Sequence, residues 1–392
     1  MDHRSRFLEL QTLLDRLGDF WRPAPFHVRK PWWCDRRPDL AAAVRALDDA
    51  ELEYFRSDPA AATAWLAPHL PELDSLHGLC AIPRLPERIL PAVDAHLDRA
   101  VPRRKREQIE AFVSRSPRHD KPLLEWCSGK GHLGRRAALR DRVAVTSLEL
   151  DPVLCEQAGM LATRAGVAQT VVCEDAMSAT AQARVRDHTV LALHACGELH
   201  RSLVRNATRA GAHAYRIAPC CYHRGAGELY QPLNPFATLA LDNRALRLAV
   251  TELVTAPGRD RRRLARDQTW KLGFIALRNE LEGEAERSFK PVPPDWLRGD
   301  FQGFCSRIAS REALDLPGKV DWQHWENEGL RRREEMARLE LVRHAFRRPL
   351  EIWLALDIGL ALEQAGFAVS MGTFCERGLT PRNLMVLADP AA

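Results

Sequence analysis

The sequence contains no long apolar run, no internal repeat and no cysteine pair with zinc-ribbon spacing. A helix that crosses a bilayer needs about 20 consecutive apolar residues, so we expect no membrane partner. No apolar stretch typical of a secretory signal follows residues 1–6. Ten cysteines are present, and without a secretory context we expect them to be reduced thiols. These absences predict a cytoplasmic or nuclear protein, with cytoplasmic favoured.

The composition is that of a globular protein, with 46% hydrophobic and 28% charged residues. A chain of 392 residues is long enough for two or three domains. The formal charge of +5 is compatible with an RNA partner, although a basic face is more often simply solvated. We expect no DNA partner.

Residues 1–100 are predicted to form a helical N-terminal region of short amphipathic segments separated by prolines. Residues 7–17 carry one apolar stripe, and residues 40–55 carry another with Asp39 as a possible N-cap. The aromatic and basic residues between them, at 23–33, read as an extended segment. This segment is either a platform that stacks on nucleotides or a loop pinned by two tryptophans, and the loop is favoured.

Residues 101–224 show alternating strand and helix patterns, which are typical of a parallel sheet with crossover helices. A basic helix comes first, with Ile109, Phe112 and Val113 facing a core. Strands are expected at 122–127, 143–149, 170–174, 189–194 and 214–218. The sequence therefore predicts an α/β, Rossmann-like fold, in which ligands bind beyond the carboxyl ends of the strands.

Residues 225–348 are predicted to be a mostly helical, basic insertion that caps the sheet and selects the substrate. Its first arginine cluster comprises Arg259, Arg261, Arg262 and Arg263. Few acidic residues accompany this cluster, so we expect it to bind substrate phosphates. A second cluster, at 331–348, contains glutamates that favour ordinary ion pairing. Residues 349–392 are expected to add a helix and a closing β-hairpin, which completes a mostly parallel, seven-stranded sheet.

A glycine-dense turn follows the first predicted strand. Gly129-x-Gly131-x-x-Gly134 matches the dinucleotide fingerprint by letter, which is a weak signal by itself. Glu125 precedes the turn, and a carboxylate that faces the ligand suits a cationic group rather than a pyrophosphate. S-adenosylmethionine (SAM) carries an ammonium and a sulfonium and has no phosphate. Glu125-x-Cys127-x-Gly129-x-Gly131 is similar to the acid-x-Gly-x-Gly-x-Gly turn of class I SAM-dependent methyltransferases, with Cys127 replacing the first glycine.

Two further acids end the next two strands. Glu149 is placed to bridge the ribose hydroxyls of SAM, and Asp175 is placed to accept from the adenine amino group. Either acid alone could be a helix N-cap, but three acids in this order make that explanation weaker. The expected cofactor contacts are Glu125, Cys127, Ser128, Gly129, Gly131, Leu133, Glu149, Leu150, Asp175, Ala176, His194 and Cys196.

The most distinctive motifs lie at later strand ends. They are Ser-Gly-Lys-Gly-His-Leu at 128–133, His-Ala-Cys-Gly-Glu-Leu at 194–199, Cys-Cys-Tyr-His at 220–223 and Thr-Pro-Arg-Asn-Leu at 380–384. Together they resemble the methyltransferase-like protein 25 group and, less closely, the eukaryotic tRNA acceptor-stem 2′-O-methyltransferase. The resemblance covers residues 120–224 well and 349–390 fairly. It implies a class I methyltransferase fold, SAM as cofactor, and an RNA, tRNA or rRNA, as one option for the acceptor.

Candidate catalytic residues follow the fourth and fifth strands. The sequence at His194 lacks the Asp/Asn-Pro-Pro-aromatic motif of enzymes that methylate exocyclic amines, which disfavours that acceptor. Cys220 is either a nucleophile, as in RNA cytosine-C5 methyltransferases, or a packed cysteine at the strand end. The packed cysteine is favoured, because the resembled tRNA enzyme has the cysteine pair and methylates a ribose hydroxyl. His223 is the best candidate for a proton acceptor, His194 is a weaker one, and Tyr222 is expected to bind substrate.

A metal site is another interpretation of the same strand ends. The residues that could converge there are Cys127, Cys196, Cys220, Cys221, His194 and His223. Because adjacent cysteines are awkward as joint tetrahedral ligands, we expect no metal. Three functions remain open: a methyltransferase acting on RNA, one acting on a protein or small molecule, and a silent binding module. The silent binding module is suggested by Cys127, which stands where the methyltransferase turn has its first glycine.

Overall fold

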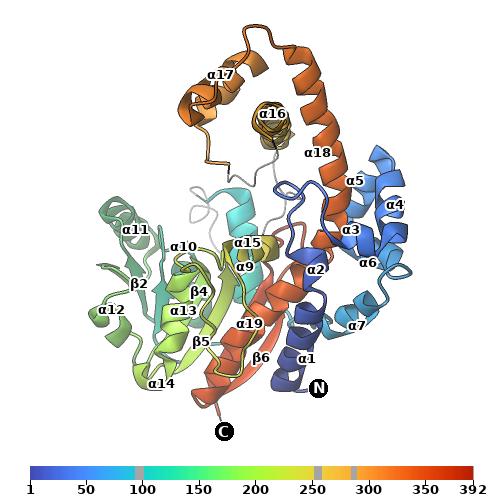
Figure 1. The fold of residues 1–392 in the computed structure, drawn as a ribbon. Helices are drawn as coiled ribbons and strands as arrows, with labels where there is room; N and C mark the ends of the chain where they lie inside the picture. The colour runs from blue at the N-terminus through green and yellow to red at the C-terminus, as the bar shows by residue number, and fades with distance from the viewer. Residues whose placement is uncertain (93–100, 251–257, 284–288, 392) are drawn as a thin grey trace. The chain divides into compact units, whose positions relative to one another are not determined.

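The computed structural model describes residues 1–92, 101–250, 258–283 and 289–391 (Figure 1). Internal contacts divide the chain into two compact units. Unit 1 comprises Met1–Asp15, Leu76–Thr255 and Arg347–Ala392, and unit 2 comprises Arg16–Ser75 and Ala256–Phe346. The sequence predicts four consecutive segments, whereas these contacts group the two ends of the chain with its centre.

Unit 1 is built on a seven-stranded sheet with the order β3-β2-β1-β4-β5-β7-β6. Its strands are β1 (Leu123–Trp126), β2 (Val145–Glu149), β3 (Gln169–Cys173), β4 (Thr189–Cys196), β5 (Ala214–Cys220), β6 (Phe367–Thr373) and β7 (Leu384–Pro390). Neighbouring strands among the first five are parallel, and β7 is antiparallel to both β5 and β6. This arrangement confirms the expected Rossmann-like class I methyltransferase fold with its closing hairpin.

The described helices, in chain order, are α1 (His3–Arg16), α2 (Gly18–Trp21), α3 (Trp33–Arg36), α4 (Pro38–Ala46), α5 (Asp49–Ser57), α6 (Pro59–Leu66), α7 (Glu72–Leu79), α9 (Arg103–Arg115), α10 (His132–Asp141), α11 (Pro152–Ala165), α12 (Ala179–Ala183), α13 (Glu198–Arg205), α14 (Ala207–Ala210), α15 (Asn243–Val250), α16 (Gly258–Glu282), the 3-10 helix η1 (Pro294–Leu297), α17 (Phe301–Glu312), α18 (Trp322–His344) and α19 (Arg347–Gln364). Within the described residues, no helix is both long and apolar enough to cross a membrane.

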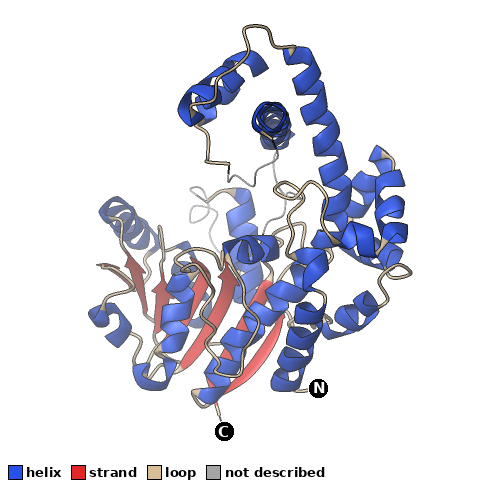
Figure 2. Ribbon diagram, viewed as in Figure 1, coloured by secondary structure: helices blue, strands red, loops and turns tan. Residues whose placement is uncertain are grey.

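Helices cover both faces of the sheet, as Figure 2 shows. The central strands β1 and β5 are buried along their whole length, which is typical of parallel strands covered on two sides. Helices α9 and α10 pack together, while α13, α14 and α15 pack against α19. Ile109, Phe112 and Val113 of α9 are buried, as the sequence predicts.

The direction of the chain reverses beside β1. The chain passes from β1 through β2 to the edge strand β3, and then returns to form β4 on the other side of β1. Connections that leave β1 and β4 therefore diverge, and doubly wound sheets bind ligands at this point. The topology places the candidate site at the carboxyl ends of these strands.

The N-terminal helix α1 belongs to the sheet unit. Phe7 is fully buried and stacks on Trp353 of α19, with ring centroids 4.8 Å apart. Gln11 is also buried, and its Oε1 accepts the backbone N–H of Thr238 at 2.8 Å. Helix α19 ends before Gly366, whose φ of 90° is the left-handed conformation typical of a glycine that follows a helix.

Unit 2 is helical. Its helices α16 and α18 approach each other closely because glycines face the contact: a Cβ on Gly329 would lie 2.3 Å from the carbonyl oxygen of Thr269. The helix expected at 40–55 is instead two helices, since Asp48 begins α5 with a capping box. Asp39 is not an N-cap but lies in the first turn of α4, because Pro38 begins that helix one residue earlier.

The aromatic and basic segment at 23–33 is a loop with turns rather than the extended segment that the sequence suggests, and the favoured loop interpretation holds. The backbone N–H groups of His27 and Val28 both bond to the carbonyl oxygen of Ala24. Trp33 is 1% exposed and fixes the loop in the interior, whereas Trp32 is 46% exposed. One tryptophan therefore pins the loop, where the sequence suggested two.

Candidate functional site

The loops that follow the first four strands meet around Cys127. Burial raises the pKa of the Cys127 thiol to about 12, and electrostatic interactions with Glu149, Cys196 and Asp175 add to this effect. These neighbours come from the ends of β2, β4 and β3 respectively. The predicted convergence of the strand ends is therefore present in the fold.

Alternating residues of the turn after β1 have left-handed backbone conformations. The φ angles of Cys127, Gly129 and Gly131 are 55°, 58° and 66°. Cys127 thus adopts the conformation that glycine favours at this position of the turn, at a cost of about 1–2 kcal/mol. The replacement of glycine by Cys127 preserves the shape of the turn.

The sequence suggested that Glu125 faces the ligand, but in the structure its side chain points away from the ligand side of the turn. Its side chain is 3% exposed, and its Oε2 accepts the hydroxyl of Ser147 at 2.7 Å. The backbone N–H of Gly134 also bonds to this carboxyl, and a Cβ on Gly134 would lie 2.6 Å from Oε2. Burial raises the pKa of Glu125 above its usual value. The acid is therefore a support beneath the turn, held between β2 and α10.

A buried polar network extends this support. Gln169 Nε2 donates to the carbonyl oxygen of Gly131 at 3.1 Å and to Ser147 Oγ at 2.7 Å. Arg135 of α10 donates to Gln169 Oε1 at 2.9 Å and to the carbonyl oxygen of Lys130 at 2.8 Å. The network fixes the turn from below. Sequence reasoning did not select Gln169 or Arg135, because neither lies in a recognisable motif.

Glu149 is held at the end of β2 by three backbone N–H groups. Its Oε2 accepts from Gly129 at 2.7 Å, and its Oε1 accepts from Leu150 at 3.0 Å and Asp151 at 3.1 Å. The bond from Gly129 joins the β2 end to the turn after β1. A carboxylate oxygen has two acceptor positions, so Oε2 keeps one for a ligand hydroxyl.

The residues after β2 and β3 combine exposed apolar side chains with an exposed acid. Leu150 is 64% exposed and Met177 is 46% exposed. Asp175 is also exposed, and its Oδ1 accepts the backbone N–H of Met177 at 2.9 Å, while Ala176 is buried. Its neighbour Glu174 instead bonds to Ser178 and Arg184 of the following segment. Asp175 is therefore the acid that remains available to a ligand.

Of two other expected cofactor contacts, Ser128 is available to a ligand and Leu133 is not. Ser128 is 8% exposed, and within the described residues its Oγ has no hydrogen-bond partner. An unpaired buried hydroxyl in the turn is a position that a polar ligand group can satisfy. Leu133 packs into the hydrophobic core with Leu123 and Val145, so it supports α10 rather than facing a ligand.

His194 ends the regular part of β4. Its φ is 65°, and the strand pairing with β5 shifts between Leu193 and Cys196. The ring Nε2 lies 3.2 Å from Gln108 Oε1 of α9. Burial lowers the pKa of His194 to about 4, and the nearby charge of Arg382 contributes. The helix α9 and the C-terminal segment therefore both reach the β4 end, which the sequence alone did not specify.

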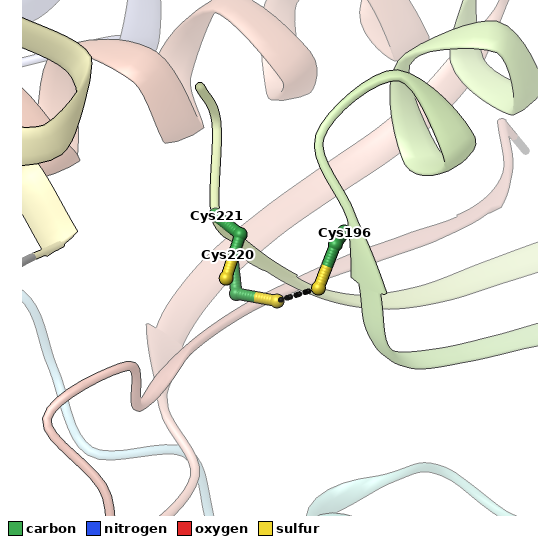
Figure 3. A group of neighbouring side chains, drawn as sticks. All are labelled: Cys196, Cys220 and Cys221. Atoms are coloured by element: carbon green, nitrogen blue, oxygen red, sulfur yellow. Dashed lines mark hydrogen bonds between the residues drawn. The ribbon is translucent and has the colours of Figure 1, made fainter. Parts of the chain in front are cut away.

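Three cysteine thiols gather between the ends of β4 and β5 (Figure 3). The Sγ atoms of Cys196, Cys220 and Cys221 all lie within 4.8 Å of one another, and Cys196 and Cys220 are 3.5 Å apart. Hydrogen bonding with Cys196 and Cys220 lowers the pKa of Cys221, whereas hydrogen bonding with Cys196 and Cys221 raises the pKa of Cys220. Cys220 is 1% exposed, so its thiol is buried and protonated. It fits the packed cysteine of the two interpretations rather than the nucleophile.

Tyr222 and His223 follow the cysteine pair. Tyr222 is fully buried and meets His200 edge to face, with ring centroids 5.6 Å apart, so it cannot bind substrate as expected. The chain reverses after Cys221 and turns this ring into the core. His223 is half-buried, and within the described part of the chain its Nδ1 has no hydrogen-bond partner. Burial lowers the pKa of His223 below its usual value, as does Arg247.

The first arginine cluster lies in unit 2, at the start of α16. Its members Arg259, Arg261, Arg262 and Arg263 are all exposed. Arg261 lies 3.8 Å from Glu53, and both side chains are mostly in solvent. Among the described residues, the other three have no ion pair. In the second cluster, Arg343 pairs with the interspersed Glu340 at 3.6 Å, as the sequence predicts. Arg331 and Arg338 instead pair with Glu328 and Asp49, which lie outside the cluster.

Comparison with known proteins gives one family match. A family described as "Methyltransferase domain" matches residues 104–227, which span α9, the strands β1 to β5 and the cysteine pair. No curated protein matches the chain. Among solved structures, the chain is similar to the crystal structure of the [4+2]-cyclase SpnF, with 19% identity and a TM-score of 0.26. The match covers 38% of this chain and 54% of that one, so it spans about half the length of SpnF. Residues 104–227 are therefore similar to a methyltransferase domain.

Proposed function

We propose that the protein transfers a methyl group from SAM to RNA, with tRNA or rRNA as the acceptor. The placement of Glu149 supports SAM as the cofactor. Its carboxylate is fixed by three backbone N–H groups at the point where the chain direction reverses in the sheet. A carboxylate held in this way can accept from a ribose hydroxyl through the free position on Oε2 without reorganisation.

The residues present fit SAM. Oε2 of Glu149 has a free acceptor position for a ribose hydroxyl, and Asp175 can accept from the adenine amino group. Leu150 and Met177 offer exposed apolar surface to the adenine ring. Ser128 Oγ and the open space above Gly129 lie in the turn, where the methionine end would bind. When bound, SAM supplies an electrophilic methyl group on its sulfonium.

His223 is the residue we assign to the acceptor. It follows β5, and its Nδ1 has no hydrogen-bond partner within the described residues. An imidazole nitrogen at this place can accept the proton of an acceptor hydroxyl or orient that hydroxyl for in-line attack. His194 is better suited to positioning, since its Nε2 already contacts Gln108.

RNA is proposed as the acceptor because of charge. Arg259, Arg262 and Arg263 are exposed on one helical turn, and among the described residues they have no ion pair. Unpaired guanidinium groups of this kind bind phosphates. The net charge of +5 and the resemblance to a tRNA methyltransferase agree with this choice.

The proposal is tested by supplying tritiated SAM together with RNA, protein or small-molecule fractions of a cell extract. Label in RNA that ribonuclease releases supports the proposal. Label found only in protein or small molecules would support the alternative acceptors and overturn the RNA assignment. Tight SAM binding with no labelled product would indicate a silent module.

A further inference from the structure

The three thiols at the ends of β4 and β5 form a compact group within the part of the chain that the structure describes. Cys196 ends β4, Cys220 ends β5, and Cys221 begins the following turn. Their Sγ atoms lie within 4.8 Å of one another, and Figure 3 shows the sulfur atoms gathered between the two strand ends. Three thiols in such proximity have the chemistry of a soft-metal ligand set.

The backbone explains how two adjacent cysteines serve one site. In a regular strand, the side chains of Cys220 and Cys221 would point to opposite faces of the sheet. Cys221 instead has a φ of 46°, which is left-handed and unusual for a residue with a side chain. This turn brings its sulfur toward that of Cys220. The objection that adjacent cysteines make poor joint ligands therefore does not apply here.

The third cysteine is brought in by strand pairing. Cys196 is the register partner of Cys220, after a shift in the β4–β5 pairing that follows Leu193. The backbone N–H of Gly197 donates to the carbonyl oxygen of Cys220 at 3.0 Å. That bond lies next to both thiols, so the sheet itself fixes the Cys196–Cys220 separation.

The loop that carries Cys221 is also tied to β4. Glu198 N–H donates to the carbonyl oxygen of Arg224 at 2.9 Å, and Arg224 N–H donates to that of Cys221 at 2.8 Å. Gly197 makes this approach possible, since a Cβ there would lie 2.0 Å from the Arg224 oxygen. A ligand set held by a rigid backbone loses little entropy when it binds a metal.

The separations match the requirement of a tetrahedral zinc ion. Zn–S bonds of about 2.3 Å place two thiolate sulfurs about 3.8 Å apart. The Cys196–Cys220 separation of 3.5 Å is close to this value, and no Sγ pair in the group exceeds 4.8 Å. Side-chain rotations that move the sulfur atoms by less than about 1 Å would bring all three to tetrahedral Zn–S geometry.

We propose that Cys196, Cys220 and Cys221 bind one Zn²⁺ ion as thiolates, with a fourth coordination position open beside the β4 and β5 ends. Arg382 lies near Cys221, so positive charge is available to offset the surplus negative charge of three thiolates and one Zn²⁺. The proposal goes beyond methyl transfer and does not depend on SAM binding.

The test uses the full chain, purified under reducing conditions, stripped with a chelator and then titrated with Zn²⁺ against a chromophoric competitor. We expect one Zn²⁺ per chain by elemental analysis. Substitution with Co²⁺ should give the thiolate-to-cobalt charge-transfer band and the intense visible bands of a tetrahedral site. These spectra need no variant and report thiolate ligation directly.

Variants then assign the ligands. Cys196→Ser, Cys220→Ser and Cys221→Ser should each lower the Zn²⁺ affinity at least tenfold and weaken the charge-transfer band. Cys173→Ser changes an exposed cysteine of β3 and should leave both unchanged. The proposal is overturned if the natural protein binds no Zn²⁺ at micromolar concentration or binds Cu(I) in its place. It is also overturned if the variants retain the cobalt spectrum, or if the protein purified under reducing conditions still holds a Cys196–Cys220 disulfide.

Discussion

The carboxylate of Glu149 accepts the backbone N–H of Gly129 at 2.7 Å. This bond links the end of β2 to the glycine turn after β1, across 20 residues of sequence. The same carboxylate also accepts from Leu150 and Asp151. Glu149 therefore shapes two of the loops at the switch point, and it retains the acceptor capacity that a ribose would use.

Replacing Glu149 with alanine should weaken SAM binding. Hydrogen bonds to a charged acceptor contribute about 1.5–3 kcal/mol each, so the loss corresponds to a roughly 10- to 150-fold higher Kd. Isothermal titration calorimetry with SAM or S-adenosylhomocysteine measures it. Glu156→Ala removes an exposed acid of the adjacent helix α11 and should leave the Kd unchanged. Equal affinity of Glu149→Ala and the natural protein would contradict the assigned cofactor site.

The two glycines of the turn should differ in their tolerance of alanine. Gly129 and Gly131 both have left-handed φ angles, so each alanine costs about 1–2 kcal/mol in backbone strain. A Cβ on Gly129 meets nothing within 4 Å, whereas one on Gly131 would lie 2.2 Å from Gln169 Nε2. Displacing Gln169 breaks its bonds to Ser147 and Gly131, at about 1 kcal/mol each.

We therefore expect Gly131→Ala to lower the free energy of unfolding by about 2 kcal/mol more than Gly129→Ala does. Urea denaturation of the two variants, followed by circular dichroism, provides the measurement. The strain is common to both, so the difference reports the contact with Gln169. Equal destabilisation would show that Gln169 moves aside freely and that the network beneath the turn is weak.

Removing the Ser147 hydroxyl should destabilise the sheet unit. The hydroxyl donates to Glu125 Oε2 at 2.7 Å and accepts from Gln169 Nε2 at 2.7 Å. Ser147→Ala leaves both buried partners short of a hydrogen bond, which costs about 1–3 kcal/mol. Thr170→Ala, at an exposed position of β3, should cost under about 1 kcal/mol. Similar urea midpoints for the two variants would argue against a buried role for Glu125.

Acid should destabilise the protein through His119. The side chain is 6% exposed, and burial together with Arg216 and Arg140 lowers its pKa to about 2. The unfolded state takes up a proton below about pH 6.5 and the folded state does not, so stability is lost as the pH falls through this range. The loss is about 1.4 kcal/mol per pH unit, or about 2 kcal/mol at pH 5.

The measurement is the free energy of unfolding between pH 7 and pH 5. His119→Gln should flatten this dependence relative to the natural protein, whatever its effect at pH 7. His77→Gln removes an exposed histidine and should keep the steeper dependence. A pH profile that is the same in all three proteins would mean that His119 is protonated in the folded state.

The arginines of α16 should control RNA affinity and its salt dependence. The triple variant Arg259→Ala, Arg262→Ala, Arg263→Ala should reduce the slope of log K against log salt by about 0.7 for each phosphate that is no longer neutralised, or about 2 in total. Filter binding of total tRNA at several salt concentrations measures the slope. Arg331→Ala removes an exposed arginine already paired with Glu328 and should change it little. An unaltered slope in the triple variant would exclude this cluster from the RNA-binding surface.

Local sequence signals were sufficient to place the strands and the turn. Apolar runs such as 214–218 and 189–194 become buried strands because parallel strands must hide both faces. The glycines at 129 and 131 mark left-handed positions, and the acids Glu149 and Asp175 mark strand ends. These features depend on a few neighbouring residues, so the sequence alone determined the fold class and the places where the strands end.

The direction of individual side chains depended on tertiary packing. Glu125 turns beneath the glycine turn because Ser147 of the neighbouring strand accommodates it there, and Tyr222 enters the core beside His200. The three thiols meet only because β4 pairs with β5 and Cys221 adopts a left-handed backbone. Strand register and backbone reversal join residues far apart in the chain, and no local pattern specifies that pairing. The sequence alone therefore determined the positions of the strand ends, whereas the packing between strands decided which side chains share a site.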